Sequence, residues 1–358
     1  MAITKHTRWI QSAPFDLLFI LAPQFIVAFM LIMFSDFAHS LGELPAWLWI
    51  ALIVGVDVSH VYSTVFRTYL DPRERLRMPD LYRIFPLIGW VVGVMLYSIH
   101  SLYFWRVLAY LAAFHFVRQQ YGFMMLYASR CRTGSPLLDK AAIYTATIYP
   151  LLYWHCYERE FHWFLAKDFL FFQEPRLASI GLFIYVAVMA VYIWQELRDL
   201  LMRRVFNLPK NLLLFATGFT WWIGIITFNN DIAFTATNVI AHGLPYLALI
   251  WIYKRREAIL HNSKSCFFRV TGIPLYLGVL FLIAFLEEWV WDGVLWRDHS
   301  ELFPWFWALE APSNAVLSIV VPLLALPQLL HYIFDAFIWR LHAGDPQWKT
   351  ILLGGSGK

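Results

Sequence analysis

Residues 177–196 read LASIGLFIYVAVMAVYIWQE, an apolar run whose only charged member is Glu196 at its end. Because a helix rises about 1.5 Å per residue, roughly 20 apolar residues span the hydrocarbon core of a bilayer, which is about 30 Å thick. The run therefore predicts a transmembrane helix. The same criterion predicts nine further spans, at residues 15–35, 45–66, 84–104, 106–128, 138–156, 211–229, 232–253, 271–291 and 313–338.

The composition of the whole chain agrees with this prediction. Of its 358 residues, 60% are hydrophobic and 15% are charged, whereas a soluble domain is about half apolar and about a quarter charged. These values exclude a soluble globular domain, a disordered chain and a nucleic-acid-binding protein. We expect one integral-membrane domain over residues 1–358, an all-α transmembrane helix bundle of about ten spans.

The basic residues predict the orientation of the bundle. If the N-terminus is cytoplasmic and the chain crosses ten times, the cytoplasmic segments hold 22 of the 28 Lys and Arg residues, and Arg118 lies within a span. This bias follows the positive-inside rule. It predicts that both termini are cytoplasmic, in a bacterial-type inner (cytoplasmic) membrane. The net charge of +4 then reflects topology, and no nucleic-acid partner is expected.

Four of the twelve histidines lie well inside predicted spans, where an ionisable side chain requires a partner or a function. They are His60, His115, His242 and His331. Counted from the nearest basic residue on the expected cytoplasmic side, they stand 7, 15, 12 and 9 positions into their helices. These depths agree within about 12 Å. With some helix tilt, the four histidines can therefore converge on one layer of the bundle.

Each of these histidines has a polar residue three or four positions away, on the same face of its helix. The four motifs are VDVSH at 56–60, HFVRQQYG at 115–122, NVIAHGLP at 238–245 and HYIFD at 331–335. The polar neighbours are Asp57, Gln119, Asn238 and Asp335. Because apolar residues surround each pair, the four polar faces are expected to point at one another inside the bundle.

A cluster of neutral imidazoles is a nitrogen-rich site that suits iron, copper, zinc or nickel. The four histidines are the predicted ligands, and Asp335 is either a further ligand or an acid that orients His331. Asp57, Gln119 and Asn238 are expected to orient the imidazoles or to hold a metal-bound water, as polar groups behind metal ligands commonly do. Two other interpretations stay open at this point, a polar path for protons or substrate and separate helix–helix hydrogen bonds.

Histidines from separate transmembrane helices around one metal resemble the Brp/Blh family of membrane carotene dioxygenases. The resemblance rests on His60, His115, His242 and His331. It implies a non-haem ferrous iron and the cleavage of a polyene by dioxygen to an aldehyde. Members of that family carry two ligands on one helix as HxxxH, whereas this chain has His331 followed by Asp335 at that spacing.

We therefore expect a metal-dependent membrane oxidoreductase that uses iron (Fe2+) and dioxygen on a lipophilic substrate, a carotenoid or another lipid. Arg118 is a candidate catalytic residue that binds a substrate carboxylate or an oxygen species; alternatively, it pairs with Asp57 or Asp335. Tyr121, the second candidate catalytic residue, is expected to line the substrate pocket together with Tyr246. Two other function classes stay open: a proton- or metal-coupled transporter, and a b-haem electron-transfer protein with paired axial histidines.

Overall fold

Helices account for the regular structure in the described part of the chain. The computed structural model describes residues 8–36, 38, 44–261, 267–305, 310–339 and 350–352, and within these ranges it contains no strand. In the labels, η marks a π-helical segment, except for the 3-10 turn η4. The elements are α1 (Ala13–Asp16), η1 (Leu17–Leu21), α2 (Ala22–Met33), α4 (Ala46–Trp49), η2 (Ile50–Val58), α5 (Ser59–Arg67), α6 (Pro72–Arg77), α7 (Pro79–Ile99), α8 (Ser101–Arg130), α9 (Pro136–Cys156), α10 (Pro175–Arg203), α11 (Leu208–Trp221), η3 (Trp222–Thr227), α12 (Asp231–Leu260), η4 (Val270–Gly272), α13 (Ile273–Trp291), η5 (Asp292–Trp296), α14 (Asn314–Leu324) and α15 (Leu326–Ile338).

Seven of the helical stretches in the described ranges are long and apolar enough to cross a membrane, which indicates a multi-pass membrane protein. The other three predicted spans, at residues 106–128, 138–156 and 211–229, are also helical but fall short of this criterion. Their helices are α8, α9 and the pair α11–η3. Helix α8 carries His115, Arg118, Gln119 and Gln120 in its middle, and these residues lower its mean hydropathy. The seven stretches are Ala13–Met33, Ala46–Arg67, Pro79–Ile99, Pro175–Arg203, Asp231–Leu260, Val270–Trp296 and Asn314–Ile338.

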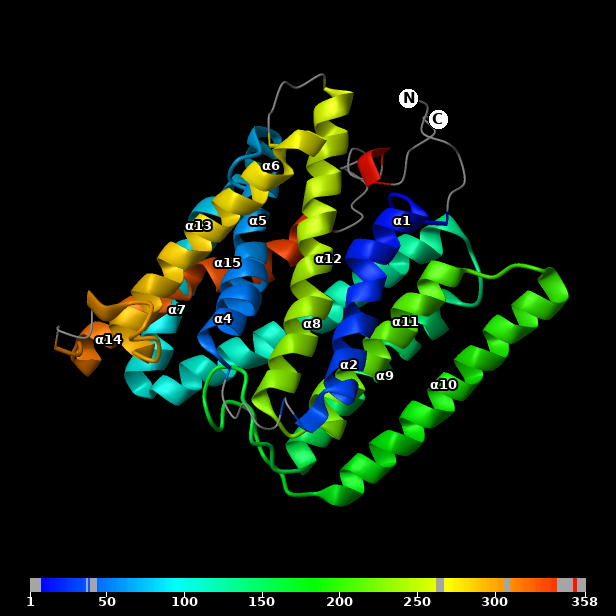
Figure 1. Cartoon of the computed structure of the whole chain (residues 1–358), viewed down its shortest axis with the longest axis horizontal. Coiled ribbons are helices and arrows are strands. Elements are labelled where there is room, and N and C mark those ends of the chain that lie inside the picture. The colour runs from blue at the N-terminus through cyan, green and yellow to red at the C-terminus, as the bar shows by residue number, and fades with distance from the viewer. Residues whose placement is uncertain are drawn as a thin grey trace.

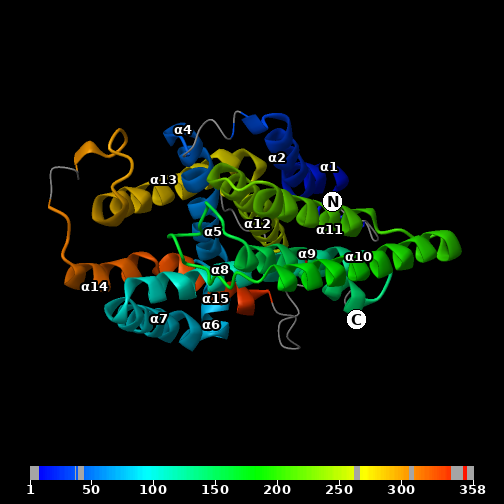
Figure 2. The ribbon, with the colours of Figure 1, turned by 90° about the horizontal axis from the view of Figure 1, so that it is seen from below.

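Helix α12 forms the centre of the bundle, while α7 and α10 lie at its edges (Figures 1 and 2). In the most apolar stretch of α12, 83% of the residues are buried, against 11% in α7 and 17% in α10. The outward faces of α7 and α10 carry large apolar side chains such as Met95 and Phe183. Apolar surface this extensive requires a lipid environment. Helix α12 is therefore the most enclosed of the seven candidate spans in the described ranges, and the candidate site is built around it.

Hydrogen bonds join the connections at one end of the bundle, the upper end in Figure 1. Near the end of α12, Arg256 donates to the carbonyl oxygens of Ile10 (2.8 Å) and Leu352 (2.7 Å). Also near that end, Lys254 Nζ donates to Asp71 Oδ2 at 3.1 Å. The beginning and the end of the described chain thus meet at the same end of α12.

A second set of hydrogen bonds joins another group of connections between helices. Arg106 donates to the carbonyl oxygen of Lys167 at 2.9 Å, and Arg159 donates to that of Ile225 at 2.6 Å. Within each set, the joined segments would lie on the same side of the membrane in a ten-crossing topology.

A buried ion cluster ties three of these helices together. Lys210 Nζ at the start of α11 donates to Asp139 Oδ1 of α9 at 2.9 Å and to Glu196 Oε1 of α10 at 2.7 Å. The three side chains are at most 5% exposed. Loss of the ammonium would leave two buried carboxylates without their cation, so the cluster constrains how α9, α10 and α11 pack.

Candidate metal centre

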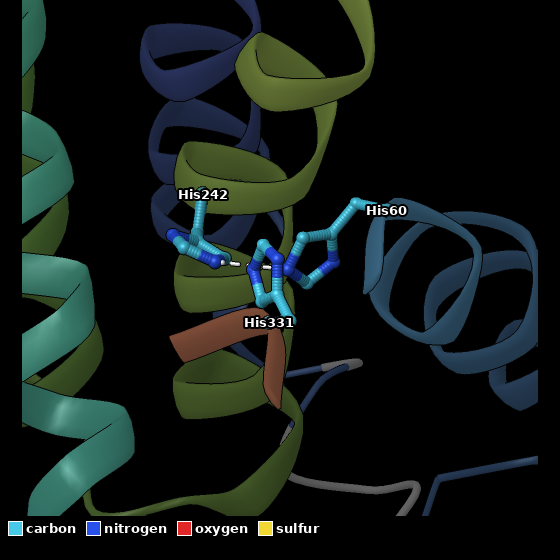
Figure 3. Close-up of side chains that lie close together, drawn as sticks. All are labelled: His60, His242 and His331. Atoms are coloured by element: carbon cyan, nitrogen blue, oxygen red, sulfur yellow. Dashed lines mark hydrogen bonds between the residues drawn. The ribbon is translucent and has the colours of Figure 1, made fainter. Parts of the chain in front are cut away.

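Four imidazoles from four helices meet in the interior of the bundle. His60 comes from α5, His115 from α8, His242 from α12 and His331 from α15, and each is at most 5% exposed. Around the circuit His60–His242–His115–His331 and back to His60, successive ring centroids are 4.5, 4.9, 4.5 and 4.9 Å apart. Across the circuit, His242 and His331 are 6.2 Å apart. Figure 3 shows His60, His242 and His331 pointing at one another from their separate helices.

One pair of ring nitrogens has the spacing of two ligands on a single metal ion. His60 Nε2 and His242 Nε2 are 2.9 Å apart. A metal–imidazole bond is about 2.0–2.1 Å long, so two neighbouring nitrogens on one ion lie about 2.8–3.0 Å apart in octahedral geometry and about 3.3–3.4 Å apart in tetrahedral geometry. Within the described residues, the buried Nε2 atoms of His115 and His331 have no hydrogen-bond partner. Buried polar atoms are normally paired, and a cation between the rings would satisfy these two.

Asp335 borders the same centre. Candidate ligand atoms within 4.8 Å of one another form two groups, His60–His242–His331 and His115–His331–Asp335, which share His331. The two oxygens of Asp335 have different surroundings. Oδ1 accepts a hydrogen bond from the Tyr246 hydroxyl at 2.5 Å, and Oδ2 lies 3.8 Å from His115 Nε2. The carboxylate therefore offers its second oxygen to the centre while its first is held by tyrosine.

A short chain of hydrogen bonds lies behind His331. Its Nδ1 is 2.6 Å from Thr64 Oγ1, and Thr64 Oγ1 is 3.0 Å from the Tyr246 hydroxyl, which donates to Asp335. With Nδ1 engaged by Thr64, the Nε2 atom of His331 is the nitrogen left for the centre. Sequence reasoning missed Thr64 and placed Tyr246 only in the pocket wall. Thr64 follows His60 by four residues and Tyr246 follows His242 by four residues. The helical spacing therefore already indicated that both share a face with a cluster histidine.

His60 is placed by a close approach between η2–α5 and α12. Its Nδ1 lies 3.3 Å from the carbonyl oxygen of Val56 and 3.7 Å from Asp57 Oδ1. On α12, a Cβ added at Gly243 would lie 2.7 Å from Val56 Cγ1, 3.2 Å from Val56 O and 3.3 Å from His60 Nδ1. Glycine is thus required for this approach. The π-helical turns of η2, a conformation found often at functional sites, directly precede His60.

The remaining polar residues singled out from the sequence have other partners. Gln119 donates its amide N–H to the carbonyl oxygen of His242 at 2.8 Å, across the gap between α8 and α12. Its Oε1 is buried and has no partner among the described residues. Asn238 donates to the carbonyl oxygen of Phe234 at 2.8 Å, one turn earlier in its own helix. Gln119 therefore links two of the helices that carry histidines, whereas the described hydrogen bond of Asn238 stays within α12.

Aromatic rings enclose the centre. The ring of Phe116 stacks on His242 with a centroid distance of 3.6 Å and an interplanar angle of 12°. Trp163, in the connection between α9 and α10, packs on the other side of Phe116 at 5.0 Å. Tyr332 lies 4.9 Å from His115. These rings exclude water from the cluster and limit access to the directions in which cavities reach it.

Two cavities reach the cluster. One of about 320 Å³ is lined by His115, Asp335, Tyr121 and Tyr246, as the sequence predicted for the two tyrosines, and by Arg118 and Gln119. The other, of about 260 Å³, has a mainly apolar wall that includes Thr64 and His331. Both volumes are near or below the lower end of those typical for small-molecule sites.

Arg118 lies on the wall of the larger cavity. It donates to the Tyr144 hydroxyl at 2.9 Å, and its guanidinium lies 5.3 Å from the centre of the Tyr121 ring. It forms no ion pair with Asp57 or Asp335, the two partners considered from the sequence. The guanidinium is therefore held by two tyrosines on the cavity side of α8.

Comparison of the chain with protein-family models, with curated proteins and with solved structures gave no match. The resemblance to the Brp/Blh carotene dioxygenases therefore stays an expectation from the four histidines, and the site is interpreted from its own contacts.

Proposed function

We propose that this chain is a membrane-embedded, non-haem iron oxidoreductase of the dioxygenase type that acts on a lipophilic substrate. The observation that carries the proposal is the closed circuit of four buried imidazoles, in which the Nε2 atoms of His115 and His331 have no hydrogen-bond partner among the described residues. Imidazole-rich sites select first-row transition metals over magnesium or calcium. His60, His115, His242 and His331 would hold the ion, and Asp335 would be a further ligand or would hold a water on it.

The combination of ligands and access favours a catalytic metal site over a structural one. A structural metal site is closed by its protein ligands, whereas a catalytic site keeps a position open. Here cavities of about 320 and 260 Å³ reach the cluster. Ferrous iron, when bound, supplies the redox chemistry that activates dioxygen. A lipid or carotenoid entering from the bilayer is the substrate class that the apolar walls suit.

The protein groups around the centre have separable tasks. Thr64 holds His331 in one ring orientation through Nδ1, and Tyr246 holds Oδ1 of Asp335. The Tyr246 hydroxyl donates to Asp335 Oδ1, which keeps a proton donor beside the centre. Phe116, stacked on His242, keeps water out.

The geometry argues against the b-haem alternative. Axial ligands stand on opposite sides of the haem iron, so their nitrogens are about 4 Å apart with the macrocycle between them. His60 Nε2 and His242 Nε2 are 2.9 Å apart, and the neighbouring ring centroids in the circuit are 4.5–4.9 Å apart. A macrocycle does not fit between neighbouring rings at these distances. His242 and His331 are 6.2 Å apart across the circuit, but the rings of His60 and His115 flank that gap and occupy the space that a macrocycle would need.

We further propose that all ten predicted helices cross the membrane, with both termini in the cytoplasm and the chain in a bacterial-type inner membrane. The two separate sets of contacts between connections support this topology. The polar residues of α8 do not exclude a crossing, because several of them face the cluster or the cavity rather than lipid.

Metal analysis of the detergent-purified full chain, with an absorption spectrum of the same sample, tests the proposal. We expect about one iron per chain and no haem band, with the iron lost in His115→Ala. The matched control is His155→Ala, because His155 is a half-buried histidine whose partners, Tyr110 and the Leu151 carbonyl, lie outside the cluster. A metal ion that exchanges freely would favour the alternative function of a metal-coupled transporter. If the protein bound no metal selectively, the proposed four-histidine metal site would be refuted. Oxygen uptake with carotenoids and other lipids then tests the reaction.

A further inference from the structure

Arg118 is an exposed residue of α8, and its charge has no counter-charge among the described residues. It lies 12 residues before Arg130, the end of α8, which is about 18 Å along the helix. A cation at such a depth in a membrane protein requires a counter-charge or access to water. The contacts of Arg118 in the described structure are the Tyr144 hydroxyl and the Tyr121 ring, and neither carries a negative charge. Its immediate surroundings include the larger cavity.

The wall of that cavity changes character along α8. The residues that α8 contributes recur at helical spacing, beginning with Phe114–His115 and Arg118–Gln119. They continue to Ser129, which is about 21 Å of helix from His115. Beyond Gln119 the wall is mainly apolar, with Gly122, Met125 and Leu126 from α8. One end of the cavity is therefore polar and cationic, and the rest is suited to a hydrocarbon chain.

We propose that the cavity beside α8 binds an amphiphile with a single-charged carboxylate headgroup, with the carboxylate on Arg118 and the apolar chain directed along α8 toward Ser129. The proposal rests on the proposed function insofar as this ligand is the substrate, and it specifies the substrate class. Arginine binds carboxylates through two parallel hydrogen bonds. Contacts with Tyr144 and Tyr121 hold the guanidinium of Arg118 at the cavity wall.

The charges on the cavity wall favour one negative charge over two. Arg118 is the single cation among the lining residues, and Asp335 is an acidic residue on the same wall. Gln119 Oε1 is a buried acceptor without a partner among the described residues, so it offers no donor to a second negative charge. A phosphate monoester carries about −1.5 to −2 charges at neutral pH. One guanidinium compensates a carboxylate fully and a phosphate only in part.

This binding mode would place the headgroup end of the ligand beside the metal centre. His115 and Arg118 are three residues apart on α8, so their Cβ atoms are about 5–6 Å apart on one face. A carboxylate on Arg118 is thereby within one helical turn of His115.

Equilibrium binding of radiolabelled dodecanoate to the purified full chain in a nonionic detergent tests the proposal. The protein is first treated with a chelator, so that binding is measured independently of iron and turnover. Unlabelled dodecanoate, dodecanol and dodecyl phosphate serve as competitors with one chain length and three headgroups. The variants are Arg118→Gln and Arg118→Lys, with Arg83→Gln as a control for loss of an exposed arginine outside the cavity.

We expect dodecanoate to compete at least about tenfold better than dodecanol, the effect of one charge-assisted pair. Arg118→Gln should lose that preference, Arg118→Lys should retain part of it, and Arg83→Gln should retain all of it. Equal competition by dodecanol, or wild-type binding by Arg118→Gln, would overturn the proposal. Stronger competition by dodecyl phosphate would also overturn it, in favour of a phosphate headgroup. Because the assay needs no metal, carboxylate binding by a chain that fails the iron analysis would refute the proposed function alone.

Discussion

Gly243→Ala should disrupt the metal centre without altering any ligand. The added Cβ would lie 2.7 Å from Val56 Cγ1, with Val56 O at 3.2 Å and His60 Nδ1 at 3.3 Å. Carbon atoms in favourable contact are about 3.5–4.0 Å apart, so α12 and η2 must separate by roughly 1 Å at this point. Val56 is β-branched and stiff at χ1, which prevents a simple side-chain rotation from relieving the overlap.

The expected magnitude follows from how strictly a metal site limits displacement. Overpacking of a filled interior costs about 1–3 kcal/mol. Metal–ligand distances tolerate about 0.2 Å. His60 follows η2 directly, so a displacement of about 1 Å at Val56 should carry its imidazole out of bonding range. We expect metal affinity to fall by about 10- to 100-fold, the size of effect seen when the groups behind metal ligands are altered.

The assay is iron content at a series of chelator-buffered free iron concentrations, with thermal unfolding in detergent measured in parallel. Gly278→Ala is the matched control, because a Cβ at Gly278 in α13 meets nothing within 4 Å. Val56→Ala in the Gly243→Ala background removes the closest contact and should restore part of the affinity. Wild-type iron affinity in Gly243→Ala would refute the reasoning, as would a lack of any rescue by Val56→Ala.

Three further predictions concern the surroundings of the centre and the rest of the bundle. Thr64→Val removes the hydroxyl 2.6 Å from His331 Nδ1 at nearly constant volume, and iron affinity should fall about tenfold in the same chelator assay; unchanged affinity would argue against that role. Burial opposes ionisation of Asp71, but nearby cations, Lys254 above all, hold its pKa below the usual value. The stabilisation is then complete above the unfolded-state pKa of about 3.9 and is lost as the pH falls through the folded-state value. Asp71→Asn should therefore lower the unfolding free energy by about 1 kcal/mol at pH 7 and make less difference below pH of about 4; a difference that grows in acid would contradict this assignment. Lys210→Met should destabilise the fold by about 3–5 kcal/mol because two buried carboxylates lose their cation, as measured by denaturant unfolding, and a loss below about 1 kcal/mol would show that the cluster is not energetically important.

Much of the fold could be predicted because lipid imposes a simple rule on sequence. Apolar runs such as residues 177–196 have to be helical, since no other local structure satisfies the backbone hydrogen bonds within a bilayer. The same rule marks His60, His115, His242 and His331 as exceptional, because each interrupts an apolar helix. The polar character of α8 also follows from its sequence, although the residues that face its cavity could not be assigned without the neighbouring helices.

The hydrogen-bond partners within the site were harder to predict. A histidine in a helix can contact a polar residue one turn before it or one turn after it. Which of the two it contacts depends on the residues of neighbouring helices that pack there. For His60 and His242 the sequence favoured Asp57 and Asn238, which precede them. Asp57 lies 3.7 Å from His60 Nδ1, whereas Asn238 bonds within α12. Thr64 and Tyr246, which follow the two histidines, belong to the chain of hydrogen bonds to His331 and Asp335.

By itself the sequence determined that this is a multi-pass helical membrane protein, and it singled out four histidines inside predicted spans, each beside a polar residue. Tertiary structure alone decided that the four rings form a closed circuit, that Gly243 permits the close approach at His60, and that Arg118 faces a cavity instead of an acidic partner. The physical reason is the range of the interactions. Helix formation and burial in lipid are decided by each segment separately. The distances between side chains on different helices depend on tilt, rotation and the size of every residue at the contact, which no single segment contains.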